Sequence, residues 1–308
     1  MRPVALTVSV VVALALGACR STPESVSVPL PVTQSVVAHV DADADAYANG
    51  NLNAVLWVQS AAEYDAAALS VYNAAAARLD AALADPAWDA LAEGERHDAA
   101  PLGTLPPAVI LDVDETVLDN SPYQARLVRD GGAYDGATWA AWVDERASRA
   151  VPGVAGFLRE ARERGITVVY LTNRTHAMQE ATLDNLRALG LPADDGTRFL
   201  GKGAPGCEQA GSDKACRRAQ VAAGYRVLML VGDQLGDFVE PAGGKPAGTP
   251  AARQALVDRH AGWFGDRWWM LPNPTYGDWE PAVFGNDWGL PAEARRAAKR
   301  AALDTGGR

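Results

Sequence analysis

The stretch AVILDVDET, residues 108–116, decides the fold, because an apolar run ends abruptly there in two aspartates, Asp112 and Asp114. A short and continuous apolar run indicates a strand that is buried on both faces of a sheet. Two carboxylates at the end of a buried strand are costly to fold unless they are used or compensated. We therefore expect a buried strand that delivers both aspartates to one edge of a sheet.

Three further apolar runs follow the first, and amphipathic segments separate them. The predicted strands are 166–171, 227–231 and 268–271, and the predicted helices are 154–164, 176–189, 214–223 and 251–260. Continuous apolar strands that alternate with helices are typical of a parallel sheet that is covered on both faces. The predicted fold class is therefore α/β.

Ahead of the first strand, residues 48–84 are rich in Ala and Leu at helical spacing, and an Asp-Pro pair ends this predicted helix. The loop that follows is rich in proline. These features divide the mature chain into a helical cap region (48–100), a core (101–290) and a C-terminal tail (291–308).

The composition excludes several classes of protein. The chain has 308 residues, of which 48% are hydrophobic and 21% charged, so it can bury a large core. Its net charge of −10 argues against a nucleic acid polymer as partner, because phosphate contacts require a basic excess. Three cysteines make neither a disulfide-rich scaffold nor a four-thiolate zinc site.

The N-terminus is typical of a bacterial lipoprotein signal peptide over residues 1–18. A basic start precedes an apolar run, residues 4–16, that is too short to span a membrane. The run ends in Leu-Gly-Ala-Cys, which resembles a lipobox and makes Cys19 the lipidation site; a plain secretory signal is the alternative. Residues 19–47 then form a tether. Arg20 after the lipidated cysteine favours the outer membrane of the cell envelope.

Polar residues cluster where three of the predicted strands end. These clusters are 112–116, 172–174 and 232–237. In open parallel sheets, ligands bind outside the carboxyl ends of the strands. We therefore expect the three clusters to meet in one crevice.

The residues in these clusters suit phosphoryl transfer. Asp112 can attack phosphorus as a nucleophile, and Asp114 can act as the acid and base. Asp112 and Asp233, with a backbone carbonyl at Asp114, offer the hard oxygen ligands that suit Mg²⁺. Thr172 and Asn173 can bind the phosphate oxygens, and a lysine should balance their charge.

The same clusters look like the four motifs of the haloacid-dehalogenase superfamily. Longer strings resemble class C bacterial acid phosphatases, a family of lipid-anchored or surface phosphomonoesterases: LWVQSAAEY (56–64), ILDVDETVLDNSPYQ (110–124), WAAWVDERASRAVPG (139–153), VGDQLGDF (231–238) and LPNPTYGDWE (271–280). The resemblance covers about residues 48–280. It implies a Rossmann-like core with a helical cap region and Mg²⁺ dependence. It also implies release of phosphate from small esters, such as nucleoside monophosphates and aryl phosphates.

Carried over residue by residue, the resemblance implies the same roles. Asp112 is the nucleophile and Asp114 the acid/base, and both form the metal site with Asp233. It adds Asp237 behind the metal ligands and keeps 172–173 as the phosphate-binding position.

The phosphate-binding lysine is a choice between Lys214 and Lys202. Lys214 follows a Ser-Asp cap at the start of a predicted helix, where the helix dipole favours an anion, and the family has its lysine there. Lys202 follows Phe199 and Leu200 and can end a short strand. The segment departs from the family pattern in having fewer lysines and a pair of cysteines. We expect Lys214 to be the ligand.

Two aromatic residues, Trp139 and Tyr276, match positions that flank the substrate base or ring in this family. Two flat faces can hold a nucleobase or aryl group while the phosphate reaches the nucleophile. The alternative is that both are core aromatics.

Cys207 and Cys216 are the two thiols that remain once Cys19 is acylated. Disulfides persist outside the cytosol, so we predict that these two cysteines pair. The bond requires the loop to fold back until the two Cα atoms lie within about 7 Å. Two free thiols, or one buried thiol, are the alternatives.

The predicted function is that of a Mg²⁺-dependent acid phosphatase, including nucleotidase activity, in the envelope. A haloacid dehalogenase has no need of Asp114 two residues after the nucleophile. A phosphomutase or phosphotransferase, and a non-catalytic surface binding lipoprotein, remain the alternatives. The oligomeric state stays open between monomer and homodimer.

Overall fold

The computed structural model describes residues 42–96, 101–240 and 248–306, with side chains from Gly50 onward. The predicted signal peptide, the lipidation site Cys19 and all of the tether up to residue 41 lie outside the described residues. Within the described part, no helix has both the length and the apolar character needed to cross a membrane.

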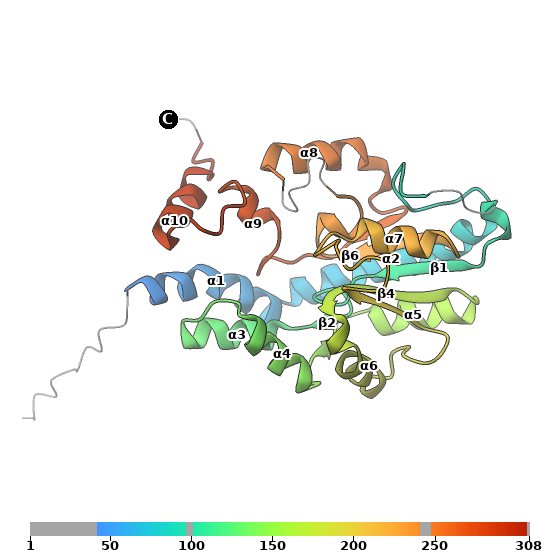
Figure 1. Cartoon of the computed structure of the whole chain (residues 1–308), viewed down its shortest axis with the longest axis horizontal. Coiled ribbons are helices and arrows are strands. Elements are labelled where there is room, and N and C mark those ends of the chain that lie inside the picture. The colour runs from blue at the N-terminus through green and yellow to red at the C-terminus, as the bar shows by residue number, and fades with distance from the viewer. Residues whose placement is uncertain (1–41, 97–100, 241–247, 307–308) are drawn as a thin grey trace, which may run out of the picture. The chain divides into compact units, whose positions relative to one another are not determined.

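A five-stranded sheet lies at the centre of the fold, in the strand order β5-β4-β1-β6-β7 (Figure 1). All four pairings are parallel. The strands are β1 (Pro107–Leu111), β4 (Thr167–Thr175), β5 (Arg198–Lys202), β6 (Arg226–Gly232) and β7 (Trp268–Met270). This confirms the α/β class and the four predicted strands, and β5 at one edge is the short strand that Lys202 can end.

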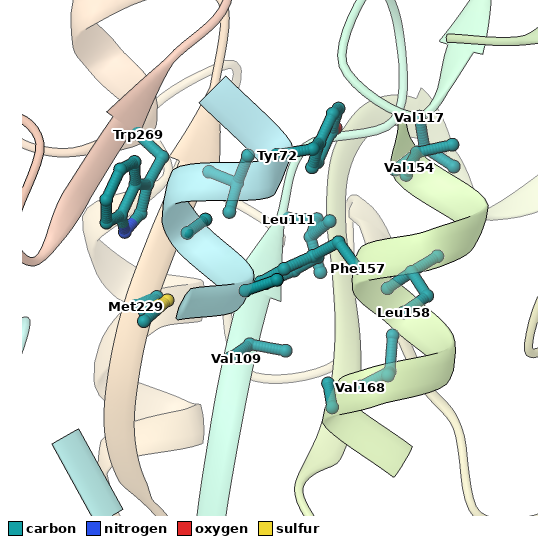
Figure 2. Packing of buried hydrophobic residues seen from close by; sticks show 14 of the residues in the cluster. Tyr72, Val109, Leu111, Val117, Val154, Phe157, Leu158, Val168, Met229 and Trp269 are labelled. Atoms are coloured by element: carbon teal, nitrogen blue, oxygen red, sulfur yellow. The ribbon is translucent and has the colours of Figure 1, made fainter. Parts of the chain in front are cut away.

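One face of the sheet is covered by α2 (Ala62–Ala84) and α5 (Val154–Glu163). Figure 2 shows Tyr72 of α2, Phe157 of α5 and Leu111 of β1 in the same buried cluster, and the ring centroids of Tyr72 and Phe157 lie 5.7 Å apart. Burying side chains of this size contributes about 1.5–3 kcal/mol each. The opposite face packs against α7 (Ala215–Ala222), so the sheet is buried on both sides as its apolar runs predict.

The predicted helix over 48–84 is in fact two helices, α1 (Ala42–Ser60) and α2. Ala61 between them adopts an extended conformation, with φ −83° and ψ 122°. Figure 1 shows α1 beside α3 (Ser121–Asp130), whereas α2 shares the hydrophobic core of the sheet. Part of the region expected as a cap is thus a layer of the core.

An insertion separates β1 from α5. It contains α3, α4 (Gly136–Asp144) and the short antiparallel pair β2 (Leu118–Asp119) and β3 (Arg149–Ala150). The carboxylate of Asp135 caps α4 by accepting from the N–H groups of Ala137 and Thr138. The insertion begins directly after the Asp112–Thr116 box, so it lies next to the carboxyl end of β1.

The remaining elements complete the chain. They are α6 (Gln179–Ala188), α8 (Pro250–Arg259), α9 (Trp279–Ala282), α10 (Ala292–Ala301) and the short 3-10 helices η1 (Leu102–Thr104), η2 (His176–Met178), η3 (Leu235–Asp237) and η4 (Ala261–Trp263). The segment expected as a tail therefore forms a helix, α10.

Candidate active site

Asp112 stands directly at the end of β1. Its N–H donates to the carbonyl of Val231 at 2.9 Å, which extends the pairing of β1 with β6 by one residue. The chain then turns sharply at Glu115, which has a φ of +56°. This turn leaves Asp112 and Asp114 at the carboxyl edge of the sheet, as the sequence predicts.

Lys214 reaches Asp112 from the start of α7. Its buried ammonium donates to a carboxylate oxygen of Asp112 and, at 2.6 Å, to one of Asp237. Burial alone would lower the pKa of Lys214, but the two carboxylates outweigh burial and raise it above its ordinary value. Lys202 instead donates to the hydroxyl of Ser212 at 3.2 Å. Of the two candidate lysines, Lys214 is therefore the one that contacts Asp112, the predicted nucleophile.

Three buried carboxylates form one cluster at this edge. Oxygen atoms of Asp112, Asp233 and Asp237 lie within 4.8 Å of one another. The sequence predicts Asp237 behind the metal ligands, and in the structure its carboxylate belongs to the same cluster as those of Asp112 and Asp233. The reason is the tight turn into η3, in which the N–H of Gln234 donates to Asp237 at 2.8 Å. Gly232 is required below it, since a Cβ there would overlap the Asp237 side chain.

Asp233 receives hydrogen bonds from neutral groups. Asn273 donates at 2.8 Å, Gln234 at 2.7 Å and the Thr116 hydroxyl at 3.3 Å. Burial, followed by the nearby Asp237, raises the pKa of Asp233 to about 7. Ionising the carboxylates of this cluster therefore costs free energy, and a divalent cation bound between them would offset that cost. Their oxygen donors suit a hard ion.

Asp114 is held by Arg174, which the sequence analysis did not assign. The guanidinium donates to one carboxylate oxygen of Asp114 through Nε at 2.9 Å, and its Nη2 lies 2.8 Å from the same oxygen as an ion pair. Asn120 donates to the same oxygen at 2.9 Å. Arg174 is fully buried and also donates to the Thr182 hydroxyl at 3.1 Å. These contacts fix the direction of the Asp114 carboxylate and leave its second oxygen for other partners.

The predicted phosphate-binding pair is positioned by Arg217 of α7. This arginine donates to the carbonyl of Thr172 at 2.5 Å and to the side-chain carbonyl of Asn173 at 2.7 Å. The Asn173 amide then donates to the carbonyl of Ser212 at 3.1 Å. Thr172 is fully buried, and its hydroxyl accepts from the N–H of Arg174 at 3.0 Å. Helix α7 thus orients the end of β4 as well as Asp112.

The next residue, Arg218, ties α7 to two further segments. It donates to the carbonyl of Gly236 at 2.7 Å and to both carboxylate oxygens of Glu95 at 2.5 and 2.9 Å. The predicted pair Cys207 and Cys216 forms a disulfide in the structure, with the Cα atoms 5.9 Å apart. This bond joins the loop before α7 to its first turn.

Two adjoining cavities lead into the site. A smaller one of about 220 Å³ is lined by Asp112, Lys214 and Asp233. A larger one of about 560 Å³ is lined by Trp139 and Tyr276 among others, and both cavities share Asp114, Asn173 and Tyr276.

The two predicted aromatic residues differ in their surroundings. The hydroxyl of Tyr276 donates to the buried carboxylate of Glu115, so this side chain has a second function besides its ring. Trp139 packs edge-on against Tyr123 at 5.1 Å and lies under the Arg174 guanidinium at 5.5 Å. Both rings border the larger cavity.

Residues 12–279 match the family described as HAD superfamily, subfamily IIIB (acid phosphatase). The chain belongs to this family. Membership places the chain among phosphomonoesterase hydrolases and confirms the predicted resemblance to the haloacid-dehalogenase superfamily. The family's phosphatases use a divalent metal, and the buried triad of Asp112, Asp233 and Asp237 is able to hold one.

Solved structures agree with the family. The class C acid phosphatase from Bacillus anthracis superposes with a TM-score of 0.70 at 30% identity, over 84% of this chain and 99% of that chain. The same enzyme with tungstate bound gives a TM-score of 0.69.

Plant proteins are more distant relatives. Vegetative storage protein 2 from Arabidopsis thaliana is 28% identical over 137 residues, and acid phosphatase 1 from Solanum lycopersicum is 27% identical over 130 residues. These matches cover 44% and 42% of this chain. The chain spans 51% of the length of each of these two relatives.

Proposed function

We propose that the protein is a Mg²⁺-dependent acid phosphatase that hydrolyses small phosphomonoesters, such as nucleoside monophosphates and aryl phosphates, through a phosphorylated Asp112. One observation carries the proposal: Asp112 ends a buried strand in contact with the Lys214 ammonium, and Asp114 follows two residues later. The related Bacillus anthracis enzyme binds tungstate, which, like phosphate, is a tetrahedral oxyanion.

Asp112, Asp233 and the backbone carbonyl of Asp114 are the residues that would hold Mg²⁺, and Asp237 lies close enough to join them. The ion would offset the charge of the carboxylates and of the phosphate oxygens. Lys214 also offsets negative charge at this site, because its ammonium lies between Asp112 and Asp237.

In the first step, a carboxylate oxygen of Asp112 attacks phosphorus, and the bond between phosphorus and the leaving oxygen breaks. The Asp114 carboxyl gives its proton to that oxygen. Thr172 and Asn173 orient the phosphate oxygens, since Arg217 fixes the backbone and amide of this pair.

In the second step, water attacks phosphorus and the bond to Asp112 breaks, which releases inorganic phosphate. The Asp114 carboxylate takes the proton of the water, so both aspartates return to their starting state. Arg174 keeps Asp114 aimed at the same place in both steps.

Acid quenching of the enzyme with ³²P-labelled 4-nitrophenyl phosphate tests this mechanism. The wild type and Asp114→Asn should carry label, the latter for longer, because it forms the intermediate but hydrolyses it slowly. Asp112→Asn should carry none and release no phosphate. Label on the Asp112→Asn protein would show that Asp112 is not the nucleophile.

Chelation tests the metal. Phosphate release should stop in EDTA and return with Mg²⁺, and the thermal midpoint should shift with the metal in wild type but little in Asp233→Asn. Full activity in EDTA would contradict the metal assignment. Absence of phosphate release from every ester would favour the surface binding lipoprotein instead.

We further propose that a lipid on Cys19 anchors the protein to the outer membrane. The lipobox-like end of the signal sequence and Arg20 after it support this location. Radiolabelled palmitate should be incorporated into the wild type and not into Cys19→Ser, which should move to the soluble envelope fraction. Equal fractionation of both proteins would contradict the anchor.

A further inference from the structure

The larger cavity at the site is suited to the leaving group of the substrate. Its volume of about 560 Å³ lies in the range of small-molecule sites. It shares Asp114 with the smaller cavity, and Asp114 is the residue that would protonate the leaving oxygen. A group esterified to a phosphate at Asp112 would therefore extend into the larger cavity.

One wall of this cavity, outside the part shared with the smaller cavity, comes from the C-terminal segment. Trp288 and Arg295 line it, and both follow residue 279, where the match to the family ends. Trp288 is 57% exposed, an unusual state for so large an apolar ring, and it packs edge-on against Phe284 at 5.2 Å. The Arg295 guanidinium lies over the Trp288 ring at 5.3 Å.

Arg295 carries a charge that no described carboxylate pairs. Its contacts are the Trp288 ring and, at 3.5 Å, the Trp288 carbonyl. Two acidic residues of the same cavity are already paired, since Lys299 donates to Glu280 and Arg174 to Asp114. The remaining acid, Asp278, lies in the part shared with the phosphate cavity. The wall at Arg295 is therefore cationic.

We propose that Trp288 and Arg295 select leaving groups that combine an aromatic ring with an anionic group remote from the phosphate ester. This inference rests on the proposed phosphatase function and narrows its substrate class to anionic aryl phosphates. Aromatic stacking holds the guanidinium plane in place, so a carboxylate or second phosphate can accept two hydrogen bonds from it. Lysine at this position would supply charge without that fork.

A matched pair of substrates tests the proposal. N-acetyl-phosphotyrosine carries a carboxylate that its amide, N-acetyl-phosphotyrosinamide, lacks, while ring and ester are the same. Wild type should show a kcat/KM about fivefold to tenfold higher for the carboxylate, mostly through KM. Arg295→Gln should remove this ratio, and Arg295→Lys should keep part of it.

Arg300→Gln is the control, because Arg300 is an exposed arginine of the same helix outside this cavity, and its ratio should stay that of the wild type. An equal ratio in wild type and Arg295→Gln would overturn the proposal. Calorimetric affinities of both esters for Asp112→Asn, with and without Arg295→Gln, decide it independently of turnover. If the two esters bind with different affinities but the wild type hydrolyses neither, only the phosphatase function is refuted. If the two esters bind with equal affinity, only the proposed subsite is refuted.

Discussion

Arg174 and Asp114 show how one buried arginine can set the direction of a carboxylate, here the one that we propose as the catalytic acid. The guanidinium holds one oxygen of Asp114 from two nitrogens, and it is anchored in turn by the Thr182 hydroxyl and by the side-chain oxygen of Asn120 at 3.2 Å. A buried charge with this many partners is a rigid support, because each partner restricts its rotation. The contact depends on the planar guanidinium group, which places two nitrogens beside one carboxylate oxygen.

Arg174→Lys should therefore lower kcat about tenfold to a hundredfold with a smaller change in KM, because lysine keeps the charge but loses the two-pronged contact. Steady-state kinetics on 4-nitrophenyl phosphate measure this, with thermal melting to check the fold. Arg129→Lys is the matched control, since Arg129 is exposed and pairs with the exposed Asp130 next to it. Equal losses in kcat for both variants would show that the Asp114 contact is not used.

Tyr276 combines a ring that borders the larger cavity with a hydroxyl bound to Glu115. Tyr276→Phe should keep KM for aryl phosphates within about threefold but cost about 1–3 kcal/mol of unfolding free energy, since it leaves a buried acceptor short of a donor. Tyr276→Ala should lose the stacking as well and raise KM for aryl phosphates more than for an alkyl phosphate. Urea unfolding and the two KM values separate the effects. A Phe variant as stable as wild type would contradict the role given to the hydroxyl.

At the scale of elements, α7 connects more of the site than any motif in the sequence indicates. Lys214 reaches Asp112, Arg217 holds the end of β4, and Arg218 holds the turn at Gly236. A shift of this one helix would move the Lys214 ammonium and the predicted phosphate-binding pair, Thr172 and Asn173, together. The disulfide at Cys216 restrains its first turn.

Reduction of the disulfide, or replacement of Cys207 and Cys216 by serine, should therefore lower kcat/KM about fivefold to tenfold while far-UV circular dichroism stays native. The closed loop contributes about 2–3 kcal/mol in the chain-entropy model, which a core of this size can lose. Reductant should have no further effect on the double serine variant. An unchanged kcat/KM after complete reduction would show that α7 is held by its arginines alone.

The strands can be predicted from the sequence, whereas the break between helices α1 and α2 cannot. Continuous apolar runs identify β1, β4 and β6 because strands buried on both faces require them. The break at Ala61 has no local signal, since alanine is the best helix former. Only tertiary packing separates α1, on α3, from α2, on the sheet.

The same limit applies to the site. Asp112, Asp114 and Asp233 are visible in the sequence because each follows an apolar run. Arg174 lies 60 positions from Asp114 along the chain, and a buried ion pair of that span depends on the folded arrangement. No sequence pattern indicates that Arg295 lines the larger cavity either, because its place there depends on where α10 packs.

At the scale of the whole molecule, the carboxyl end of the sheet concentrates buried acids, and this makes stability depend on pH. Glu240 lies beside them and is half-buried: its carboxylate accepts from the N–H of Lys214 at 3.0 Å and lines the smaller cavity. Burial raises its pKa to about 7, from an ordinary value of 4.5. Asp233 is shifted in the same direction.

The sign of the effect follows from linkage. Below about pH 4.5, Glu240 is protonated in both the folded and the unfolded chain and costs nothing. Between pH 4.5 and 7 the unfolded chain ionises first, so the free energy of unfolding falls as pH rises, and the loss is complete above pH 7. Glu240 alone should account for at most roughly 3 kcal/mol.

Glu240→Gln should remove this part of the loss, because the amide oxygen can still accept from Lys214 and the side chain no longer ionises. Urea unfolding at pH 5 and pH 8 measures it: wild type should lose more stability between the two than the variant. Asp233 is present in both proteins, so their difference isolates Glu240. Glu145→Gln, at an exposed ion pair with Arg126, is the control and should leave the pH dependence of the wild type nearly unchanged. The same pH dependence in wild type and Glu240→Gln would mean that Glu240 ionises as freely in the fold as in water.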